Sequence, residues 1–164
     1  MKIRLDFVTN SSSSSFILCF KDKDHIESQI NYYKARDKEN AEYYDTLLED
    51  VLRSKHIYSR KNAILACMDR IQTDRLFYDR YFSDRKFTVS IENGKRIARD
   101  SFTGEIVNDA EDEDTRQLRE LSKKASKYNY FVEVEYGDDY PEGSHMENHF
   151  VQYLPFCLFK FNNH

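Results

Sequence analysis

The chain is poor in the residues that make tight turns, with 4 Gly and 2 Pro among 164 residues. This scarcity argues against a barrel or sandwich built from many short turns, and it leaves no Gly-rich phosphate loop. No apolar run approaches the ~18 residues that a membrane span requires. The first ten residues also lack the apolar core of a signal peptide. We therefore expect a cytoplasmic protein without a membrane segment.

An excess of basic residues is also missing. The chain has 25 Lys and Arg against 29 Asp and Glu, for a formal net charge of -4. Proteins that bind nucleic acids directly usually carry a basic surplus, because neutralised phosphates release counterions. Direct nucleic-acid binding is therefore not expected, although a local basic patch stays open.

Catalytic signatures are absent too. The sequence contains no G-x-S-x-G, no P-loop and no dinucleotide-binding fingerprint. The three cysteines, Cys19, Cys67 and Cys157, are far apart and lie among apolar residues, as expected for reduced thiols in a core. The sequence therefore assigns no catalytic residue and no cofactor.

Core material is present, since 40% of the residues are hydrophobic, including 12 Phe and 12 Tyr. The apolar run Phe16–Phe20 has the length of a buried central strand. Before it, residues 2–9 alternate in the manner of a strand. The five serines Ser11–Ser15 between them predict a loop or β-bend whose hydroxyls bond to local backbone.

Helical periodicity dominates the middle of the chain. One stripe runs through Ile26, Ile30 and Tyr33, and Asp24 is a candidate cap. A break near Asp37 predicts two helices, although one continuous helix over 25–55 stays open. Ser59 is expected to cap a third helix. The other expected core positions of the second and third helices are Ala41, Tyr44, Leu48, Val51, Leu52, Ile64, Cys67, Met68 and Ile71.

After residue 86 the pattern predicts mainly strands. Asn93-Gly94 predicts a hairpin turn, and Thr103-Gly104 predicts another turn. Residues 108–114 are expected to form an acidic loop, with a short basic helix beginning at Thr115. Alternating or apolar runs predict closing strands at 130–135 and 156–161. The sum is an α+β fold: a single domain over 1–164, with a mixed or antiparallel sheet, two to three central helices and one later helix.

Two segments are candidates for contact with a partner. Asp-Arg pairs recur every five residues from Asp69 to Arg85, which is typical of a solvated helix end. The same helix end could instead offer Arg75, Tyr78 and Tyr81 to a partner, since Arg and aromatic residues are enriched at binding hot spots. The acidic residues Asp109, Asp112 and Asp114 could mimic nucleic-acid phosphates toward a basic protein, or form a solubilising loop.

A metal site is the alternative hypothesis. Glu142, His145 and His149 are spaced so that a helix would place them on one face, and such a set can bind a divalent ion in a hydrolase or nuclease. Pro141 and Gly143 argue against a helix there. A polar loop with incidental histidines is the other interpretation, and we expect no bound metal.

One string supports a resemblance. Residues 6–17, DFVTNSSSSSFI, resemble the opening of a loose group of small bacterial and phage-borne proteins. Gly137-Asp138-Asp139, Glu142-Gly143 and Asn163-His164 look similar to that group's tail. The resemblance implies a phage or mobile-element origin and supplies no activity. We therefore interpret the chain as a non-catalytic acidic binding protein with a protein partner. It would modulate or inhibit a bacterial macromolecular complex, as an anti-CRISPR inhibitor of host defence does.

Overall fold

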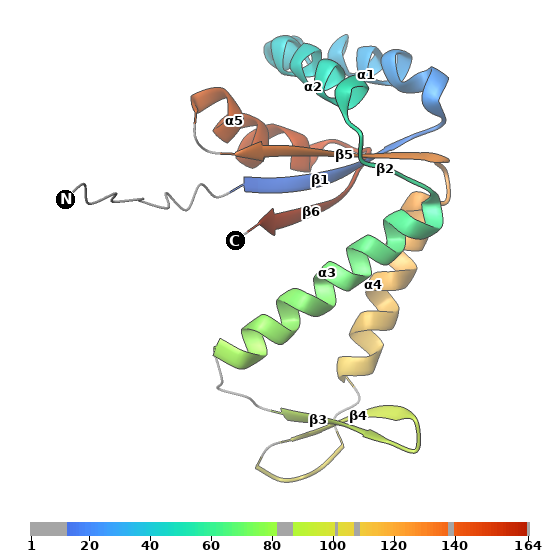
Figure 1. Cartoon of the computed structure of the whole chain (residues 1–164), viewed down its shortest axis with the longest axis vertical. Helices are drawn as coiled ribbons and strands as arrows, with labels where there is room; N and C mark the ends of the chain where they lie inside the picture. The colour runs from blue at the N-terminus through green and yellow to red at the C-terminus, as the bar shows by residue number, and fades with distance from the viewer. Residues whose placement is uncertain (1–12, 82–86, 101, 107–108, 138–139, 164) are drawn as a thin grey trace, which may run out of the picture. The chain divides into compact units, whose positions relative to one another are not determined.

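The computed structural model describes residues 13–81, 87–100, 102–106, 109–137 and 140–163 (Figure 1). The chain divides into two compact units, residues 1–63 with 125–164, and residues 64–124. That both belong to one domain stays a prediction. The elements in chain order are β1 (Ser13–Phe20), η1 (Lys23–His25), α1 (Ile26–Lys34), η2 (Lys38–Asn40), α2 (Ala41–Arg53), β2 (Ile57–Tyr58), α3 (Arg60–Tyr81), β3 (Phe87–Glu92), β4 (Lys95–Asp100), α4 (Asp109–Ala125), β5 (Tyr130–Gly137), α5 (Pro141–His145), the π-helix η3 (Met146–Phe150), η4 (Val151–Tyr153) and β6 (Cys157–Asn163).

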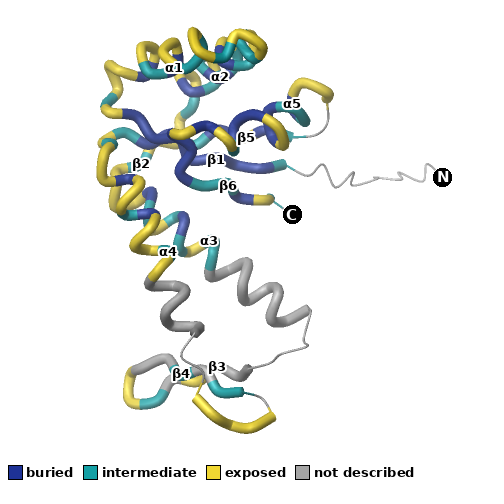
Figure 2. Tube along the Cα trace, turned by 180° about the vertical axis from the view of Figure 1, so that it is seen from behind, coloured by how far each residue is buried: buried dark blue, intermediate teal, exposed yellow. Residues whose placement is uncertain are grey.

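The first unit is built on a four-stranded antiparallel sheet in the order β2-β5-β1-β6. Strand β1 lies between β5 and β6, and every residue from Phe16 to Phe20 is fully buried (Figure 2). A run of five apolar residues suits a strand whose two faces are both covered. The prediction of a buried central strand is confirmed.

One face of this sheet carries the main core. Phe16, Leu18 and Phe20 of β1 pack in one cluster with Ile30 of α1 and Leu47 of α2, and both helices cover this face (Figure 1). Alternate strand residues share a face, so this stripe follows directly from the period of two.

A partly buried polar contact joins this sheet to α2. The Tyr136 hydroxyl donates to Asp50 Oδ2 at 2.8 Å. Burial of the phenol, with Asp50 close by, raises the pKa of Tyr136. The phenol therefore stays protonated and keeps its role as donor.

The helical middle differs from the expectation in detail. A break does occur at Asp37, so one continuous helix over 25–55 is wrong. Leu52, expected in the core, is 61% exposed, and Leu47 is buried in its place. Leu47 lies three residues after Tyr44 and four before Val51, so the three share one stripe, whereas Leu52 turns away from it.

The start of α1 also differs. Asp22, and not Asp24, accepts hydrogen bonds from the backbone N–H groups of Asp24 and His25 at the preceding turn η1. The Asp22 carboxylate thereby satisfies donors that have no partner within the helix.

The serine run was predicted to be a loop, and this is wrong for its described part. Ser13, Ser14 and Ser15 belong to β1 and pair with β5 on one side and β6 on the other. The ladders on both sides satisfy the backbone groups that a local turn would otherwise have to bond. The strand predicted at 2–9 lies outside the described residues.

The second unit contains the two-stranded hairpin β3–β4. Asn93 and Gly94 both have positive φ, 52° and 76°, as a type I′ turn requires. The predicted hairpin is confirmed. Helix α3 begins after Ser59, whose Oγ accepts from the Asn62 N–H at 3.2 Å, so this predicted cap is confirmed as well.

The acidic loop predicted at 108–114 is wrong over 109–114, and residue 108 lies outside the described residues. Helix α4 begins at Asp109, so the acidic residues form its first turns and Thr115 lies inside it. Carboxylates are favoured at a helix N-terminus because they oppose the positive end of the helix dipole. Acidic composition was therefore a signal for a helix start and not for a loop.

The α+β class is confirmed, with an antiparallel sheet. The three cysteines are buried and unbridged, as expected. Among the described residues, no helix has the length and apolar character needed to cross a membrane.

Candidate functional site

The predicted partner residues have described backbones only. Arg75, Tyr78 and Tyr81 lie in α3, and their side chains fall outside the described part of the structure. The acidic residues Asp109, Asp112 and Asp114 lie in α4, and the same holds for their side chains. Both assignments therefore stay predictions.

The predicted metal residues lie on one helical segment. Glu142 and His145 belong to α5, and His149 belongs to η3. The prediction that Pro141 and Gly143 oppose a helix here is wrong, because both belong to α5. Pro141 is its first residue, where a proline needs no N–H. The polar loop proposed for this segment is corrected by the same finding.

Two of these side chains, His145 and Glu142, contact α2, and the ring of His149 lies beside that of His145. The His145 ring stacks on Tyr43 with centroids 4.1 Å apart, and the His149 ring lies 5.7 Å from His145. Glu142 Oε1 accepts a hydrogen bond from Thr46 Oγ1 at 3.4 Å. Across the described ranges, no three His, Cys, Asp or Glu residues are grouped so that they could hold a metal ion.

The sequence did not predict a buried polar cluster around Ser14, at the start of β1. Ser14 Oγ lies 2.6 Å from Glu147 Oε1 and 3.2 Å from Asn162 Oδ1. Ser14 is 1% exposed and Glu147 4%. Lys160 Nζ donates to the Glu147 carbonyl oxygen at 3.3 Å. We call these four residues the serine–glutamate cluster.

The serine–glutamate cluster has the distances of an enzyme site but not its access. A hydroxyl 2.6 Å from a carboxylate resembles a nucleophile beside its base. However, a substrate cannot reach Ser14 while the residue is 1% exposed. The hydrogen bond instead joins β1 to η3, and we interpret the cluster as structural.

No sequence signal predicted the serine–glutamate cluster, because Ser14 and Glu147 are 133 positions apart. The segments that support the family resemblance nevertheless meet near it. Ser13 is directly opposite Gly137 in β5 and opposite Asn163 in β6. The described parts of the opening string and of the tail thus lie side by side in the sheet.

The second unit exposes a large aromatic side chain. Phe102 is 90% exposed and follows β4 in a turn closed by hydrogen bonds. Asp100 Oδ1 accepts from the backbone N–H groups of Phe102 and Thr103 at 2.8 and 2.9 Å. The Gly104 N–H donates to the Asp100 carbonyl at 2.9 Å. We call Asp100 with residues 102–106 the aromatic turn.

Backbone conformation and charge both fit the aromatic turn. Gly104 has φ 72°, a conformation that favours glycine. The two backbone N–H groups that bond to Asp100 hold the pKa of its carboxyl below its ordinary value. The carboxylate is therefore charged at neutral pH and keeps both hydrogen bonds.

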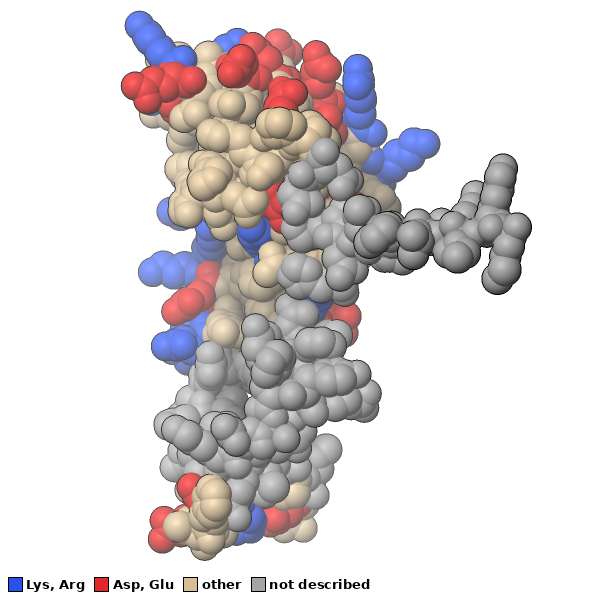
Figure 3. Space-filling view, turned by 90° about the vertical axis from the view of Figure 1, so that its left-hand side faces the viewer, with Lys and Arg blue, Asp and Glu red and all other residues tan. Residues whose placement is uncertain are grey.

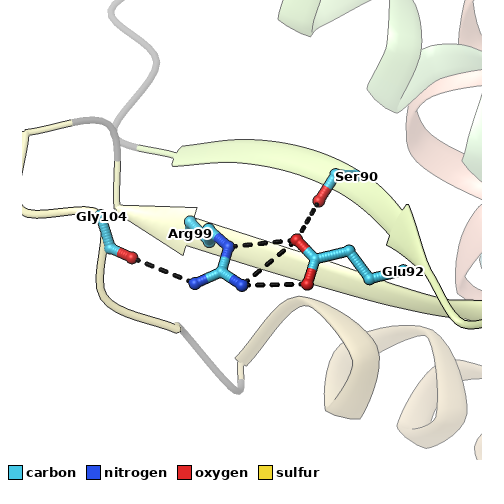
Figure 4. A network of polar contacts seen from close by, with 4 residues as sticks. All are labelled: Ser90, Glu92, Arg99 and Gly104. Atoms are coloured by element: carbon cyan, nitrogen blue, oxygen red, sulfur yellow. Dashed lines mark hydrogen bonds and ion pairs between the residues drawn. The ribbon is translucent and has the colours of Figure 1, made fainter.

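An ion pair ties the aromatic turn to the hairpin (Figure 4). Arg99 Nη2 lies 3.0 Å from Glu92 Oε2, and Arg99 Nη1 donates to the Gly104 carbonyl at 3.4 Å. Arg99, together with the Ser90 hydroxyl, holds the pKa of Glu92 below its ordinary value. The backbone adds a bridge between Arg99 and Ile106. The turn that carries Phe102 is thus held by several hydrogen bonds and by a backbone bridge to the hairpin.

The sequence predicts the turn at Thr103-Gly104 but not the exposed ring before it. Phenylalanines are expected as core material, and Phe102 departs from that expectation. Ile106, on the far side of the turn, is 57% exposed. The aromatic turn therefore combines two large apolar side chains in contact with solvent.

Comparison with known proteins supplies no assignment: no family model, no curated protein and no solved structure matches the chain.

Proposed function

We propose that the protein is a non-catalytic binding protein that modulates or inhibits a bacterial macromolecular complex by occupying a protein surface. The observation that carries the proposal is the 90% exposure of Phe102 on the hydrogen-bonded aromatic turn. The resemblance of residues 6–17 to phage-borne proteins supports the bacterial target.

Exposure of Phe102 provides the energetic argument. Complete burial of a phenylalanine side chain is worth about 1.5–3 kcal/mol, and an anchor of this kind can dominate an interface. Single exposed aromatic residues are common on protein surfaces, so exposure alone is weak support. Here the hydrogen bonds of the aromatic turn also hold the backbone that carries the side chain.

The ordered backbone of the aromatic turn reduces the entropic cost of binding. Asp100, Arg99 and Gly104 fix the backbone on both sides of Phe102 through hydrogen bonds. A loop that is ordered before binding loses less conformational entropy when it binds. A phenylalanine adds only two side-chain torsions that must be restricted.

A lysate experiment tests this proposal. The tagged protein, a Phe102→Ala variant and a Tyr153→Ala variant are used to capture proteins from a bacterial lysate, and captured proteins are quantified by mass spectrometry. Tyr153 is the matched control, because it is also aromatic and 72% exposed but lies in η4. We expect Phe102→Ala to reduce at least one captured protein about tenfold or more, the range of an interface anchor.

The control decides the interpretation. Tyr153→Ala is expected to leave the same captured proteins unchanged. Equal losses in both variants would indicate general stickiness of exposed aromatic residues. No protein that depends on Phe102 would contradict the proposed function.

A further inference from the structure

The chain from the aromatic turn into the first turns of α4 carries charge of one sign. Between residues 100 and 115 there is no Lys or Arg. The acidic residues in this range are Asp100, Glu105, Asp109, Glu111, Asp112, Glu113 and Asp114. The last five follow the aromatic turn in the first turns of α4.

The described members of this set are ionised or exposed. Asp100 has a lowered pKa because two backbone N–H groups bond to its carboxylate. Glu105 is exposed. Arg99, which directly precedes Asp100 in the chain, is paired with Glu92 within the hairpin. At the lower end of Figure 3, red acidic and blue basic side chains both lie beside tan uncharged ones.

Resting on the proposed function, we infer that the partner surface that receives Phe102 is an apolar pocket bordered by Lys and Arg side chains. The anchor is Phe102 itself, and the acidic residues determine the charge that suits it. A nucleic acid is a poor occupant, because its phosphates would be repelled by the same carboxylates. The inferred occupant is therefore a basic protein surface.

Charge complementarity should act mainly on the association rate. Opposite charges near an interface steer the encounter, and salt screens this attraction with a Debye length of about 8 Å at ~0.15 M. A charge at the edge of an interface changes the association rate and its salt dependence more than the dissociation rate. Phe102 should instead determine how long the complex lasts.

The experiment uses the protein that the Phe102-dependent capture identifies, purified and immobilised. Association and dissociation rates are measured by surface plasmon resonance from about 0.05 to 0.5 M NaCl, a range over which the Debye length becomes shorter. We compare the wild type with Glu105→Lys. The matched control is Glu39→Lys, which makes the same charge change at an exposed residue of η2.

We expect the wild-type association rate to fall about tenfold or more over this salt range, as steered association does. Glu105→Lys should lower the association rate at low salt and weaken the salt dependence, and Glu39→Lys should do neither. Circular dichroism should be the same for all three proteins.

The failures can be told apart. A Phe102-dependent partner whose association rate ignores both salt and Glu105→Lys would overturn this inference and leave the proposed function standing. Equal effects of Glu105→Lys and Glu39→Lys would also overturn it, because the net charge alone would then matter. No Phe102-dependent partner would overturn both.

Discussion

The serine–glutamate cluster and the aromatic turn place their residues in opposite ways. Ser14 and Glu147 are polar, yet they are 1% and 4% exposed, whereas Phe102 is apolar and 90% exposed. Burying a carboxylate costs free energy unless hydrogen bonds replace water, and exposing a phenylalanine forgoes the gain from burial. Each region therefore departs from the usual partition of residues.

The two regions differ in whether contacts inside the fold account for the placement of the unusual side chain. Ser14 supplies a hydrogen bond to Glu147 Oε1 at 2.6 Å, whereas Glu147 Oε2 is buried without a hydrogen-bond partner among the described residues. The contacts of the aromatic turn hold its backbone and not the Phe102 ring, which remains in solvent. The fold thus satisfies one oxygen of the buried carboxylate, and the exposed aromatic ring suggests a role outside the fold.

The largest effect should come from the apolar neighbour of Ser14. Phe16→Ala removes a fully buried ring from the central strand, so the unfolding free energy should fall by about 3–5 kcal/mol. Chemical denaturation followed by circular dichroism measures the loss. A cost under about 1 kcal/mol would contradict the assignment of β1 to the core, since surface substitutions fall in that range.

Ser14→Ala should have the next largest effect. It removes the hydroxyl that donates to the Glu147 carboxylate and leaves that group without this bond, so we expect a loss of about 1.5–3 kcal/mol, the worth of a hydrogen bond to a charged group. The matched control is Ser28→Ala, because Ser28 is an exposed serine of α1.

A double-mutant cycle sharpens the test of this cluster. In a Glu147→Met background, which offers the Ser14 hydroxyl no oxygen acceptor at this side chain, Ser14→Ala should cost less than in the wild type. Equal costs in both backgrounds would show that the two side chains do not interact, and the structural role of the cluster would fail.

The fold was largely readable from the sequence where the signal was local. The five apolar residues at 16–20 predicted the central strand, and Asn93-Gly94 predicted the hairpin, because each pattern is interpreted within its own segment. The serines at 13–15 were misread because their strand is held by β5 and β6, whose residues come more than 100 positions later. Local patterns do not show which distant strands will pair.

The candidate sites were not predicted by the sequence. The bond between Ser14 and Glu147 joins segments from opposite ends of the chain, and neither residue carries a motif. Phe102 precedes a predicted turn, but its exposure was not predicted, because phenylalanines are ordinarily core residues. The histidines were placed by spacing alone, and spacing could not show that His145 would stack on Tyr43.

Acid should loosen the aromatic turn. The pKa of Asp100 in the folded protein lies below its ordinary value of 3.8 because of its two backbone hydrogen bonds. The unfolded turn therefore binds a proton first, so this contribution is present above that ordinary pKa and is lost as pH falls through the lower folded value. Glu92, with its lowered pKa beside Arg99, should act in the same direction.

Amide NMR shifts of Phe102 and Thr103 measure this change as the pH is lowered. Both should move together, with a midpoint below 3.8, and Asp100→Asn should remove the transition. A midpoint above that value, or a transition that survives Asp100→Asn, would show that this carboxylate does not hold the turn.

The smallest effect on stability is expected at Phe102 itself. A side chain that is 90% exposed gives up almost no buried surface when truncated, so Phe102→Ala should change the unfolding free energy by less than about 0.5 kcal/mol. Thermal denaturation of the whole chain measures it, with Tyr153→Ala as the exposed aromatic control. A loss of about 2 kcal/mol or more would mean that the ring packs inside the protein in solution, as core truncations cost that much. Phe102 would then be a structural residue like Ser14, and the contrast between the two regions would disappear together with the case for a binding surface.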